Sequence, residues 1–347
     1  MKPVTLSPGF EDERGREHHG HVRMILRGGP SGSQEARLEY GVNVLDGLRR
    51  MADGSVHCAV TSPPYWGLRD YGHDATEWPR MEFTPMADVP PVTLAPEVVS
   101  LGLENSPLSF IGHLVAVFRE VYRVLKDDGV LFINMGDSYV STTGYLQPIR
   151  GKGRDYDRIG ADGDNSMDRI RPYKIRSALR HKNTAGIPWR LALALQADGW
   201  VLRNDIVWDK GSGMPEPVAD RFSRSHEYLF MLVKQRVYKF NKVDARSVWR
   251  CNSANYKGAH HASFPEPLIV TAVAAGSNPG DTILDPFSGT ATTGRVAFDL
   301  GRNYVGIDLS TEYLPLAQEK LTGEAPAVEP VADDGDVFDL FGEEGSE

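Results

Sequence analysis

Strand, turn and helix meet at Leu284-Asp285-Pro286-Phe287-Ser288-Gly289-Thr290, near the end of the 347-residue chain. The apolar run 282–284 before the turn predicts a buried strand, and residues 292–300 after it predict a helix. Gly289 allows the backbone to approach a ligand closely, and the N-terminus of the helix offers further N–H donors. Because ligands of doubly wound sheets lie at the carboxyl ends of strands, the turn predicts a site for a nucleotide-like cofactor.

An acidic residue stands at the end of the next predicted strand. Asp308 comes directly after the run 304–307, about twenty residues beyond the turn, where a carboxylate can accept hydrogen bonds from both hydroxyls of a ribose. The turn lacks the Gly-x-Gly-x-x-Gly fingerprint of dinucleotide sites, which counts against NAD. On this motif alone, a turn with a purely structural role remains the alternative.

A second motif, Thr61-Ser62-Pro63-Pro64-Tyr65-Trp66, follows the apolar run 56–60, which also predicts a buried strand. The Ser62 hydroxyl and the Pro63 carbonyl can accept hydrogen bonds from an exocyclic amine, and the paired prolines make the turn rigid. Tyr65 offers a ring on which an extruded base can stack, and Trp66 can extend that wall. The alternative is a plain Pro-Pro turn whose two aromatic side chains lie in the core.

The pattern of residues 36–322 predicts one α/β domain. Apolar runs alternate with amphipathic segments, which is typical of a doubly wound, mostly parallel sheet with helices on both faces. Strands are expected at 37–44, 56–60, 130–134, 200–208, 228–233, 282–284 and 304–307, and helices at 45–51, 110–125, 188–197, 265–275, 292–300 and 311–321.

Segments without a regular pattern flank and interrupt this domain. Residues 1–35 are expected to form a mobile arm, and residues 323–347 an acidic, disordered tail. Insertions are expected at about 69–106 and 139–184. The tail holds nine acidic residues and no Lys or Arg, which accounts for the whole net charge of -9. The body is therefore near neutral and can still carry a basic face.

Composition argues against several classes of protein. No apolar run has the length of a membrane span, and the N-terminus lacks the pattern of a signal peptide. The two cysteines, Cys58 and Cys251, are too few for a disulfide framework and lack the spacing of metal ligands. We therefore expect a cytoplasmic protein without a metal site.

Two segments are candidates for contact with DNA. The first is the insertion 139–184, in which tyrosines lie among basic residues, and the second is the segment 236–260, the candidate target-recognition segment. The basic residues expected to contact DNA are Arg150, Lys152, Arg154, Arg171, Lys174 and Arg176 in the first segment, and Arg246 and Arg250 in the second. Either segment is also compatible with a solvated surface loop.

The two motifs, in this order, resemble those of the β-group DNA amino-methyltransferases, in which the catalytic motif precedes the cofactor motif. The resemblance covers roughly residues 40–321, including 199–210 and 221–234. It implies a Rossmann-like methyltransferase fold with inserted DNA-contacting loops, and S-adenosylmethionine as the methyl donor. It implies catalytic roles for Ser62, Pro63, Pro64 and Tyr65, and cofactor contacts by Asp46, Phe264, Asp285, Pro286, Phe287, Ser288, Gly289, Thr290 and Asp308.

Two positions leave room for other interpretations. Asp46 would lie near the adenine of the cofactor by this resemblance, but a helix N-cap is the alternative role of its side chain. Ala291 stands where the family usually has glycine, and its methyl group is expected to be tolerated if the backbone keeps a negative φ.

The resemblance also bears on the target base. Ser62 at the first motif position is similar to the serine of N4-cytosine members, whereas Asp or Asn is commoner in N6-adenine members, so N6-adenine methylation remains the alternative. Methylation at C5 of cytosine is disfavoured because it needs a cysteine nucleophile, normally after proline, and neither cysteine follows a proline. A catalytically silent DNA-binding module is the rival from another class.

The implied partner is double-stranded DNA in a bacterial or phage setting, with or without an accompanying restriction endonuclease. Within the tail, Val337-Phe338-Asp339-Leu340-Phe341 is the only apolar cluster, and its Asp-Leu-Phe resembles the sliding-clamp docking peptides of replication proteins. A chance cluster that packs weakly on the body is the alternative.

Overall fold

The structure, a computed structural model, describes most of the predicted domain. It covers residues 21–30, 32–67, 75–140, 179–211, 218–252 and 264–323, and the backbone of five two-residue strands at 5–6, 10–11, 17–18, 69–70 and 147–148. The tail, most of the insertion 139–184 and most of the arm lie outside the described residues, so the predictions made for them stay predictions.

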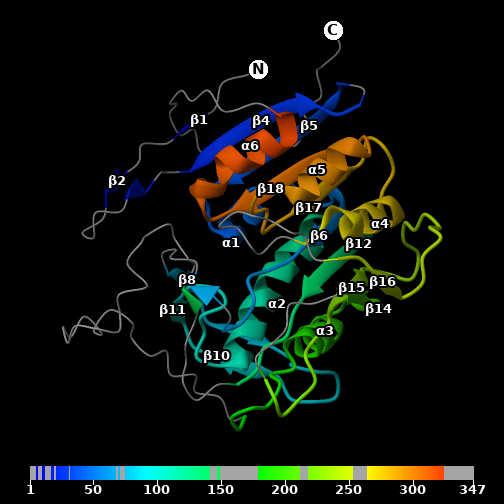
Figure 1. The fold of residues 1–347 in the computed structure, drawn as a ribbon. Helices are drawn as coiled ribbons and strands as arrows, with labels where there is room; N and C mark the ends of the chain where they lie inside the picture. Colours follow the sequence, from blue (N-terminus) through cyan, green and yellow to red (C-terminus); the bar gives the residue numbers. More distant parts are fainter. Residues whose placement is uncertain are drawn as a thin grey trace, which may run out of the picture.

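One ten-stranded sheet forms the centre of the molecule, with the strand order β1-β4-β5-β18-β17-β6-β12-β15-β14-β16 (Figure 1). Its five central strands, β5 to β12 in this order, run parallel, whereas β4, β15 and β14 are joined to their inner neighbours by antiparallel pairing. The sheet is therefore mixed, and the expectation of mostly parallel strands holds for its centre. The strands are β1 (Thr5–Leu6), β4 (Val22–Gly28), β5 (Gln34–Tyr40), β18 (Asn303–Asp308), β17 (Thr282–Asp285), β6 (Val56–Thr61), β12 (Leu125–Met135), β15 (His226–Val233), β14 (Val201–Asp209) and β16 (Val248–Arg250).

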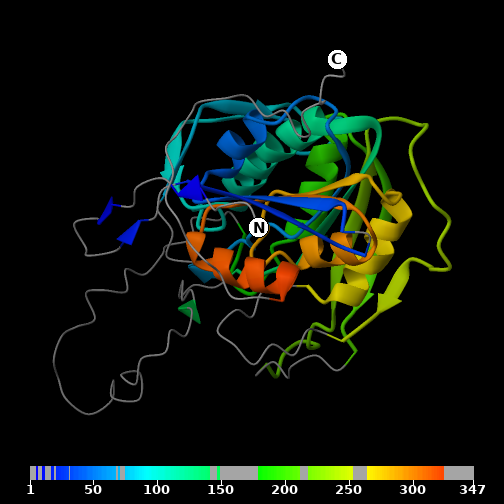
Figure 2. The ribbon, with the colours of Figure 1, turned by 90° about the horizontal axis from the view of Figure 1, so that it is seen from above.

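Helices cover both faces of this sheet, as Figure 2 shows from above. One face carries α1 (Val44–Arg49), α2 (Pro107–Val124) and α3 (Ile187–Ala197), and the other carries α4 (Glu266–Gly276), α5 (Thr292–Asp299) and α6 (Leu314–Thr322), which follows the short 3-10 helix η3 (Thr311–Tyr313). Each set of helices packs into its own cluster of buried apolar residues. The doubly wound α/β fold is therefore confirmed.

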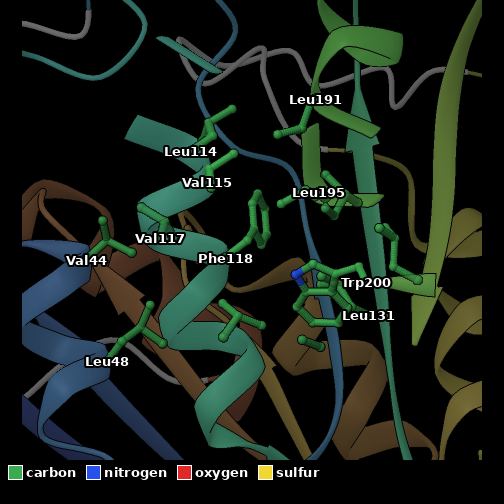
Figure 3. Close-up of a cluster of buried hydrophobic side chains, with 14 of the residues drawn as sticks. Val44, Leu48, Leu114, Val115, Val117, Phe118, Leu131, Leu191, Leu195 and Trp200 are labelled. Atoms are coloured by element: carbon green, nitrogen blue, oxygen red, sulfur yellow. The ribbon is translucent and has the colours of Figure 1, made fainter. Parts of the chain in front are cut away.

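The helix α2 lies at the centre of the first of these clusters (Figure 3). Ser106 caps its N-terminus by accepting a hydrogen bond from the backbone N–H of Ser109, and Pro107 occupies the first turn, where no N–H is required. Phe118 is fully buried on this helix, and Trp200 packs into the same cluster from the start of β14. The helix packs against α1, α3 and the sheet, so the six consecutive residues 110–115 are all buried.

The connections of two neighbouring strands leave in opposite directions. From β17 the chain passes through α5 to β18 on one side, whereas from β6 it passes through α2 to β12 on the other side. The boundary between β17 and β6 is thus the topological switch point of the sheet, where α/β folds bind their ligands beyond the carboxyl ends of the strands. We call the edge formed by the carboxyl ends of β5, β18, β17, β6 and β12 the carboxyl edge.

Two segments differ from their predicted states. Residues 22–28, expected in the mobile arm, form β4 and pair along their whole length with β5, so the sheet begins earlier than residue 36. Residues 75–106, expected to be a long loop, hold two small antiparallel pairs whose buried Trp78 and Phe83 join the core under α2. Outside the main sheet, the described residues form the strand pairs β8 (Thr76–Trp78) with β11 (Glu97–Val99), β9 (Met81–Phe83) with β10 (Val92–Leu94), β2 (Phe10–Glu11) with β3 (Glu17–His18), and β7 (Arg69–Asp70) with β13 (Gln147–Pro148).

Candidate active site

The two sequence motifs meet at the switch point. β6 and β17 are hydrogen-bonded parallel neighbours, so the turns that follow them leave the sheet side by side. The last residue of β6, Thr61, donates from Oγ1 to Oδ1 of Asp285, the last residue of β17, at 2.6 Å. This hydrogen bond therefore ties the predicted base-binding turn to the predicted cofactor turn.

Asp285 organises the cofactor turn from a buried position. Besides Thr61, its carboxylate accepts hydrogen bonds from Thr293 Oγ1 at 2.7 Å and from the backbone N–H of Phe287 at 3.1 Å. Burial raises the pKa of this carboxyl to about 6, and the three donors act against the shift. The carboxylate thus holds the strand end, the turn and the first turn of α5 together.

Asp308 lies at the same edge, one strand further from the switch point. It ends β18, and its carboxylate accepts the backbone N–H groups of Gly289 at 2.7 Å and Ser310 at 2.8 Å. Burial raises the pKa of Asp308 to about 6. Each of its two oxygens has a second lone pair, so an ionised Asp308 can also accept the two hydroxyls of a ribose.

The side chain of Ser288 supports the turn from below. Its hydroxyl lies 2.8 Å from the Tyr40 hydroxyl and 2.8 Å from the Tyr304 hydroxyl, and Tyr40 also donates to the Gly289 carbonyl at 2.7 Å. Burial is the main cause that raises the pKa of both tyrosines, which therefore stay neutral donors. The predicted part of Ser288 in cofactor binding is thus indirect in this structure.

Thr290 has a similar structural position. Its buried hydroxyl accepts a hydrogen bond from Lys320 Nζ at 2.7 Å, and the same ammonium group reaches Thr292 Oγ1 at 2.8 Å. These contacts attach α6 to the start of α5. As a result, the backbone of the turn rather than these hydroxyls is left to face a ligand.

The backbone of the turn includes two residues with positive φ. Gly289 has a φ of 51°, and a Cβ added there would meet no atom within 4 Å, so this side of the turn is open to a ligand. Ala291 has a φ of 56°, so the negative φ under which its methyl group is expected to be tolerated does not occur. The left-handed conformation costs an L-residue about 1–2 kcal/mol. The turn therefore keeps the geometry that the usual glycine would adopt, at a cost in conformational free energy.

The other predicted cofactor residues occupy different surroundings. Pro286 is buried, and Phe287 is half-buried against the α2 cluster. Phe264 is buried in the opposite cluster, before α4. Asp46 is exposed on the first turn of α1 and pairs with Arg49, whereas Asn43 caps this helix by accepting the N–H of Leu45, so the alternative of an Asp46 N-cap is wrong.

The side chains of the catalytic turn join a polar network that also includes residues from β12, β15 and the end of β14. Tyr65 donates from its hydroxyl to Glu227 Oε2 at 2.6 Å and lies 3.0 Å from Asn134 Oδ1, and Ser62 Oγ donates to the same hydroxyl at 3.4 Å. Asn134 Nδ2 donates to Glu227 Oε2 at 3.1 Å, and Lys210 Nζ forms an ion pair with Glu227 Oε1. We call these five residues the Tyr65 network.

The network could not be found from spacing along the chain. Asn134 belongs to β12, Glu227 to β15 and Lys210 follows β14, and the antiparallel pairing of these strands brings them to the carboxyl edge. The segments 199–210 and 221–234 did belong to the resemblance, but nothing in their residue pattern indicates a contact with Tyr65. Knowledge of the strand order is needed to predict it.

Gly136 gives the Tyr65 ring its place. A Cβ at this position would lie 2.5 Å from Cε2 of Tyr65 and 3.3 Å from Cδ of Glu227. The glycine is therefore required by the close approach of an aromatic ring.

We predict that Gly136→Ala lowers the rate of methyl transfer by about 10²-fold, because a ring displaced by about 1 Å no longer presents a correctly placed platform. Single-turnover transfer measures the effect, and thermal unfolding checks that the fold is kept. Gly28→Ala is the control, because a Cβ there comes no closer than 3.3 Å to the Phe298 ring, away from the carboxyl edge. A rate within twofold of the parent protein would contradict the role of Gly136.

Trp66 does not belong to the DNA-facing surface. The side chain is 1% exposed, and its Nε1 donates to the carbonyl of Glu104 at 2.9 Å. The next residue, Gly67, donates its N–H to the carbonyl of Gly102 at 2.8 Å. Trp66 thus fixes the catalytic turn to the segment before α2, and the predicted DNA contact does not fit this position.

The predicted DNA-contacting residues are described only in part. Arg250 pairs with Asp209 at the carboxyl-edge end of β14, with Nε 3.7 Å from Oδ2, and its side chain is 77% exposed. Arg246 is exposed before β16, where its carbonyl accepts a hydrogen bond from Trp249 Nε1. The residues Arg150, Lys152, Arg154, Arg171, Lys174 and Arg176 lie outside the described residues.

Two further basic residues, from the segment 221–234 of the resemblance, lie at the carboxyl edge, although neither was among the expected DNA contacts. The guanidinium groups of Arg221 and Arg224 lie 3.8 and 4.8 Å from the centre of the Tyr139 ring, just beyond the end of β12. Arg224 also lies 3.7 Å from Oδ2 of Asp137, and Asp137 accepts the N–H of Ile187 at the start of α3. Their positive charge is therefore fixed beside the Tyr65 network.

Neither cysteine has the surroundings of a nucleophile. Cys58 lies fully buried in the middle of β6, and Cys251 is half-buried after β16. Burial raises the pKa of both thiols, which disfavours the reactive thiolate. Among the residues that the structure describes, no group of three or more His, Cys, Asp or Glu side chains could hold a metal ion, and no helix is long and apolar enough to cross a membrane.

A family model described as DNA methylase, of the N6 and N4 type, matches residues 56–319, a range that includes both turns of the carboxyl edge. The chain belongs to this DNA methylase family. Among curated relatives, the type II methyltransferase M.XycI of Xanthomonas campestris pv. cyanopsidis is 42% identical over 316 residues, which cover 87% of this chain and 93% of that protein. M.Cfr9I of Citrobacter freundii is 41% identical with the same coverage, and M.SmaI of Serratia marcescens is 41% identical over 76% of this chain and 83% of that protein.

Solved structures share the fold of this DNA methylase. PvuII DNA methyltransferase, described as cytosine-N4-specific, has a TM-score of 0.56 at 17% identity, with 83% of this chain and 86% of that chain covered. A DNA modification methylase of Thermus thermophilus, TTHA0409, solved with S-adenosyl-L-methionine, has a TM-score of 0.51 at 23% identity, with 85% of this chain and 99% of that chain covered. The Rossmann-like methyltransferase fold predicted from the sequence is thereby confirmed.

The protein is a DNA amino-methyltransferase that uses S-adenosylmethionine, as its family membership shows. The carboxyl edge fits this cofactor in two respects. The turn is open on the Gly289 side, and Asp308 lies where it can accept the hydroxyls of a ribose while backbone N–H groups hold it in place.

Proposed function

We propose that this methyltransferase transfers its methyl group to the exocyclic N4 amine of cytosine in duplex DNA. One observation carries the proposal. Ser62, a short and neutral acceptor, stands at the first position of the catalytic turn, directly after Thr61, which is hydrogen-bonded to Asp285 at the start of the cofactor turn. A base amine bound at Ser62 is then presented toward the methyl group.

The difficulty of the reaction lies in the electrons of the amine. The lone pair of an exocyclic nitrogen is delocalised into the ring, so it is a weak nucleophile. Ser62 Oγ and the carbonyl of Pro63 can accept the two N–H groups, which makes the nitrogen more tetrahedral and localises its lone pair. The prolines fix the directions of both acceptors, and a near-attack geometry of this kind supplies a large part of the rate enhancement.

The base must leave the duplex to reach this turn. Base-flipping enzymes bind the extruded base by stacking and by hydrogen bonds to its Watson–Crick edge. Tyr65 can provide the stacking surface because its hydroxyl is anchored by Glu227 and the edge of its ring packs against Gly136. Arg221, Arg224 and Arg250 place positive charge at the carboxyl edge, where the flanking phosphates would lie.

The cofactor side is proposed as follows. Asp308 accepts the ribose hydroxyls, the Gly289 backbone allows close approach, and Asp285 keeps the turn in register with Thr61. When bound, S-adenosylmethionine supplies an electrophilic methyl group on a positively charged sulfur. Asp46 and Phe264 remain proposed contacts of the adenine and methionine ends.

Methylation of N6 of adenine with the same residues is the alternative. Asp or Asn is commoner than Ser at the first catalytic position of adenine enzymes, and a short serine suits the smaller pyrimidine. A silent DNA-binding module is disfavoured because Ser62, Tyr65, Asp285 and Asp308 are all present and each is held by a hydrogen bond at the carboxyl edge. We also propose an accompanying restriction endonuclease, since the relatives are type II methyltransferases.

The modified nucleoside decides between these functions. DNA methylated by the purified protein is digested to nucleosides, which are separated and identified by mass. N4-methyl-2′-deoxycytidine is the expected product. N6-methyl-2′-deoxyadenosine would instead make adenine the target base. The absence of any methylated nucleoside would contradict the enzymatic proposal.

We predict that the affinity for S-adenosylmethionine falls below about pH 6. Ribose hydroxyls donate to an ionised carboxylate, and the pKa of Asp308 is raised to about 6 by burial. Below this pKa the dissociation constant should rise about tenfold for each pH unit, and above it the constant should be level. Titration calorimetry between pH 5 and pH 8 measures it.

Protonation of Asp308 is expected to weaken cofactor binding but to stabilise the fold, so the two effects can be told apart. A carboxyl whose pKa is higher in the folded than in the unfolded protein favours the folded state when protonated, so its contribution to stability increases as the pH falls through 6. Weaker binding at pH 5 therefore does not reflect unfolding caused by Asp308. An affinity that stays constant from pH 8 to pH 5 would contradict a carboxylate on the ribose.

The acidic tail is predicted to be dispensable for the reaction. α6 ends at Thr322, and Gly323 closes it in the left-handed conformation typical of helix C-termini. A protein truncated after Gly323 should therefore methylate a short duplex at the parent rate, measured by transfer of a labelled methyl group. Loss of folding or activity would instead make residues 324–347 part of the domain, and binding of purified sliding clamp by the full chain alone would support the proposed clamp contact.

A further inference from the structure

Methylation of an amine leaves one proton too many on the nitrogen, and the Tyr65 network offers a way for it to leave. We propose that Ser62, Tyr65 and Glu227 form a proton-exit path that carries this proton from the target amine to a carboxylate. The inference rests on the proposed amine methylation, and it assigns a role to Glu227, which is linked to Ser62 through the Tyr65 hydroxyl.

The hydrogen bonds of this path point in one direction. Ser62 Oγ donates to the Tyr65 hydroxyl at 3.4 Å, and the Tyr65 hydroxyl donates to Glu227 Oε2 at 2.6 Å. Each hydroxyl can accept one proton while it releases another, so a proton that enters at Ser62 displaces one into Glu227. The first distance is long, as catalytic hydrogen bonds often are before the substrate binds.

Glu227 is held as the end of the path from two further sides. Asn134 Nδ2 donates to the same oxygen, Oε2, at 3.1 Å and also to the carbonyl of Tyr228 at 3.1 Å, which fixes the amide. Lys210 pairs with the other oxygen, Oε1. The Glu227 side chain is 11% exposed, and the ammonium group of Lys210 compensates the negative charge of its carboxylate before the proton arrives.

Atoms and charges balance along this path. The nitrogen of the base forms a bond to the methyl carbon as the carbon–sulfur bond breaks, and the bonding electrons stay on sulfur, which becomes a neutral thioether. The positive charge passes to the nitrogen, which gives its proton to Ser62 Oγ. Ser62 releases its own proton to Tyr65, and Tyr65 releases its own to Glu227, which becomes a neutral acid.

A carboxylate is a sufficient acceptor for this proton. The methylated nitrogen that still bears its second proton is a far stronger acid than a carboxylic acid, because losing the proton restores its delocalisation into the ring. General acid–base groups typically contribute about 10²–10⁴-fold to a rate when the proton transfer limits it. Water can take over part of this role, so we expect an effect of about 10²-fold.

A purely positioning role of Glu227 is the competing explanation, and one substitution separates the two. In Glu227→Gln the amide oxygen can still accept the hydrogen bond of Tyr65, so the ring stays in place, but the side chain no longer takes up a proton. Tyr65→Phe keeps the stacking ring and removes the path at its middle. The relay therefore requires both variants to be slow, whereas positioning alone leaves the glutamine variant close to normal.

The experiment measures single-turnover transfer of a labelled methyl group from S-adenosylmethionine to a duplex. Glu227→Gln, Tyr65→Phe and the double variant should each be slower by about 10²-fold, and the double variant no slower than the single ones, because they interrupt the same path. Cofactor affinity should stay within about twofold of the parent protein. The matched control is Asp198→Asn, whose carboxylate is 13% exposed and paired with Arg119 away from the carboxyl edge, and it should keep the parent rate.

Chemical rescue gives a readout that a structural role would not move. Glu227→Gly leaves space for a small base, so formate at increasing concentration should raise the rate of this variant at least tenfold over its rate without formate. In the same assay, the slow rate of Glu227→Gln should rise with pH as hydroxide takes the proton. A glutamine variant with more than half of the parent rate, or a glycine variant that formate does not accelerate, would overturn the relay.

Failure of the relay and failure of the proposed function give different results. The parent protein and the nucleoside digest report whether an amine is methylated and on which base. The ratios between variants report only the path of the proton. An active parent with fast Glu227→Gln refutes the relay alone, and an inactive parent refutes the function.

Discussion

Alanine at position 65 is expected to slow methyl transfer by about 10²-fold or more while the affinity for S-adenosylmethionine stays nearly unchanged. Stacking of a base on an aromatic ring contributes about 1–3 kcal/mol, and Tyr65→Ala also removes the hydroxyl that links Ser62 to Glu227. Ser62→Ala is expected to have a comparable effect, because it removes an acceptor of the amine proton. Single-turnover kinetics measures the rate, and calorimetry measures the cofactor affinity.

Matched controls exist for both substitutions. Tyr238 also has a hydrogen-bonded hydroxyl, which accepts from Arg203 Nε at 3.0 Å, but it belongs to the face opposite α2, so Tyr238→Ala should keep the parent rate. Ser55 donates to the carbonyl of Ala52 in the turn before β6, and Ser55→Ala should be equally silent. Near-normal turnover of both Ser62→Ala and Tyr65→Ala would show that the target base does not bind at this turn.

The second large effect is expected on the cofactor side. Asp308→Ala should weaken the binding of S-adenosylmethionine by at least about 10²-fold, since two charge-assisted hydrogen bonds to the ribose are lost and each contributes about 1.5–3 kcal/mol. The variant also leaves the N–H groups of Gly289 and Ser310 without their acceptor, which loosens the turn. Calorimetry on the folded variant measures the loss.

Asp308→Asn refines this test. The amide oxygen of the new side chain can still accept one backbone N–H, but its amide nitrogen faces the other backbone N–H. Asp308→Asn should therefore bind S-adenosylmethionine as weakly as the alanine variant. Asp299→Ala is the control, because Asp299 pairs with Arg295 on the exposed side of α5. Unchanged affinity of Asp308→Ala would place the ribose elsewhere in the protein.

Local patterns predicted most of the elements at the centre of the fold. The amphipathic period placed a helix at 110–125, where α2 spans Pro107–Val124, and the apolar runs before the two motifs became β6 and β17. Even the neighbourhood of the two turns followed from the fold class, since both end parallel strands at one edge of the sheet. These features depend on residues close together in the chain.

Features that depend on distant residues were missed. The neighbours of β4 are rich in glycine and charge and predict an arm, although the buried residues of β4 itself alternate and the strand pairs with β5. The catalytic motif places Trp66 beside the DNA, whereas in the structure its side chain is buried and hydrogen-bonded to Glu104. The Tyr65 network needs the four strands β6, β12, β15 and β14 to come together. The positive φ of Ala291 is imposed by the turn against the preference of the residue.

The switch point between β17 and β6 has a consequence for the history of such chains. Within the sheet, the base-binding half, from β6 to β16, and the cofactor half, from α4 to α6, are joined by the pairing of β17 with β6, and they send their crossovers in opposite directions. A chain in which the cofactor half precedes the base-binding half would place the same strand ends side by side. Parallel pairing depends on the direction of the strands and not on their order along the chain. Gene rearrangement can therefore permute the two halves while the carboxyl edge stays the same.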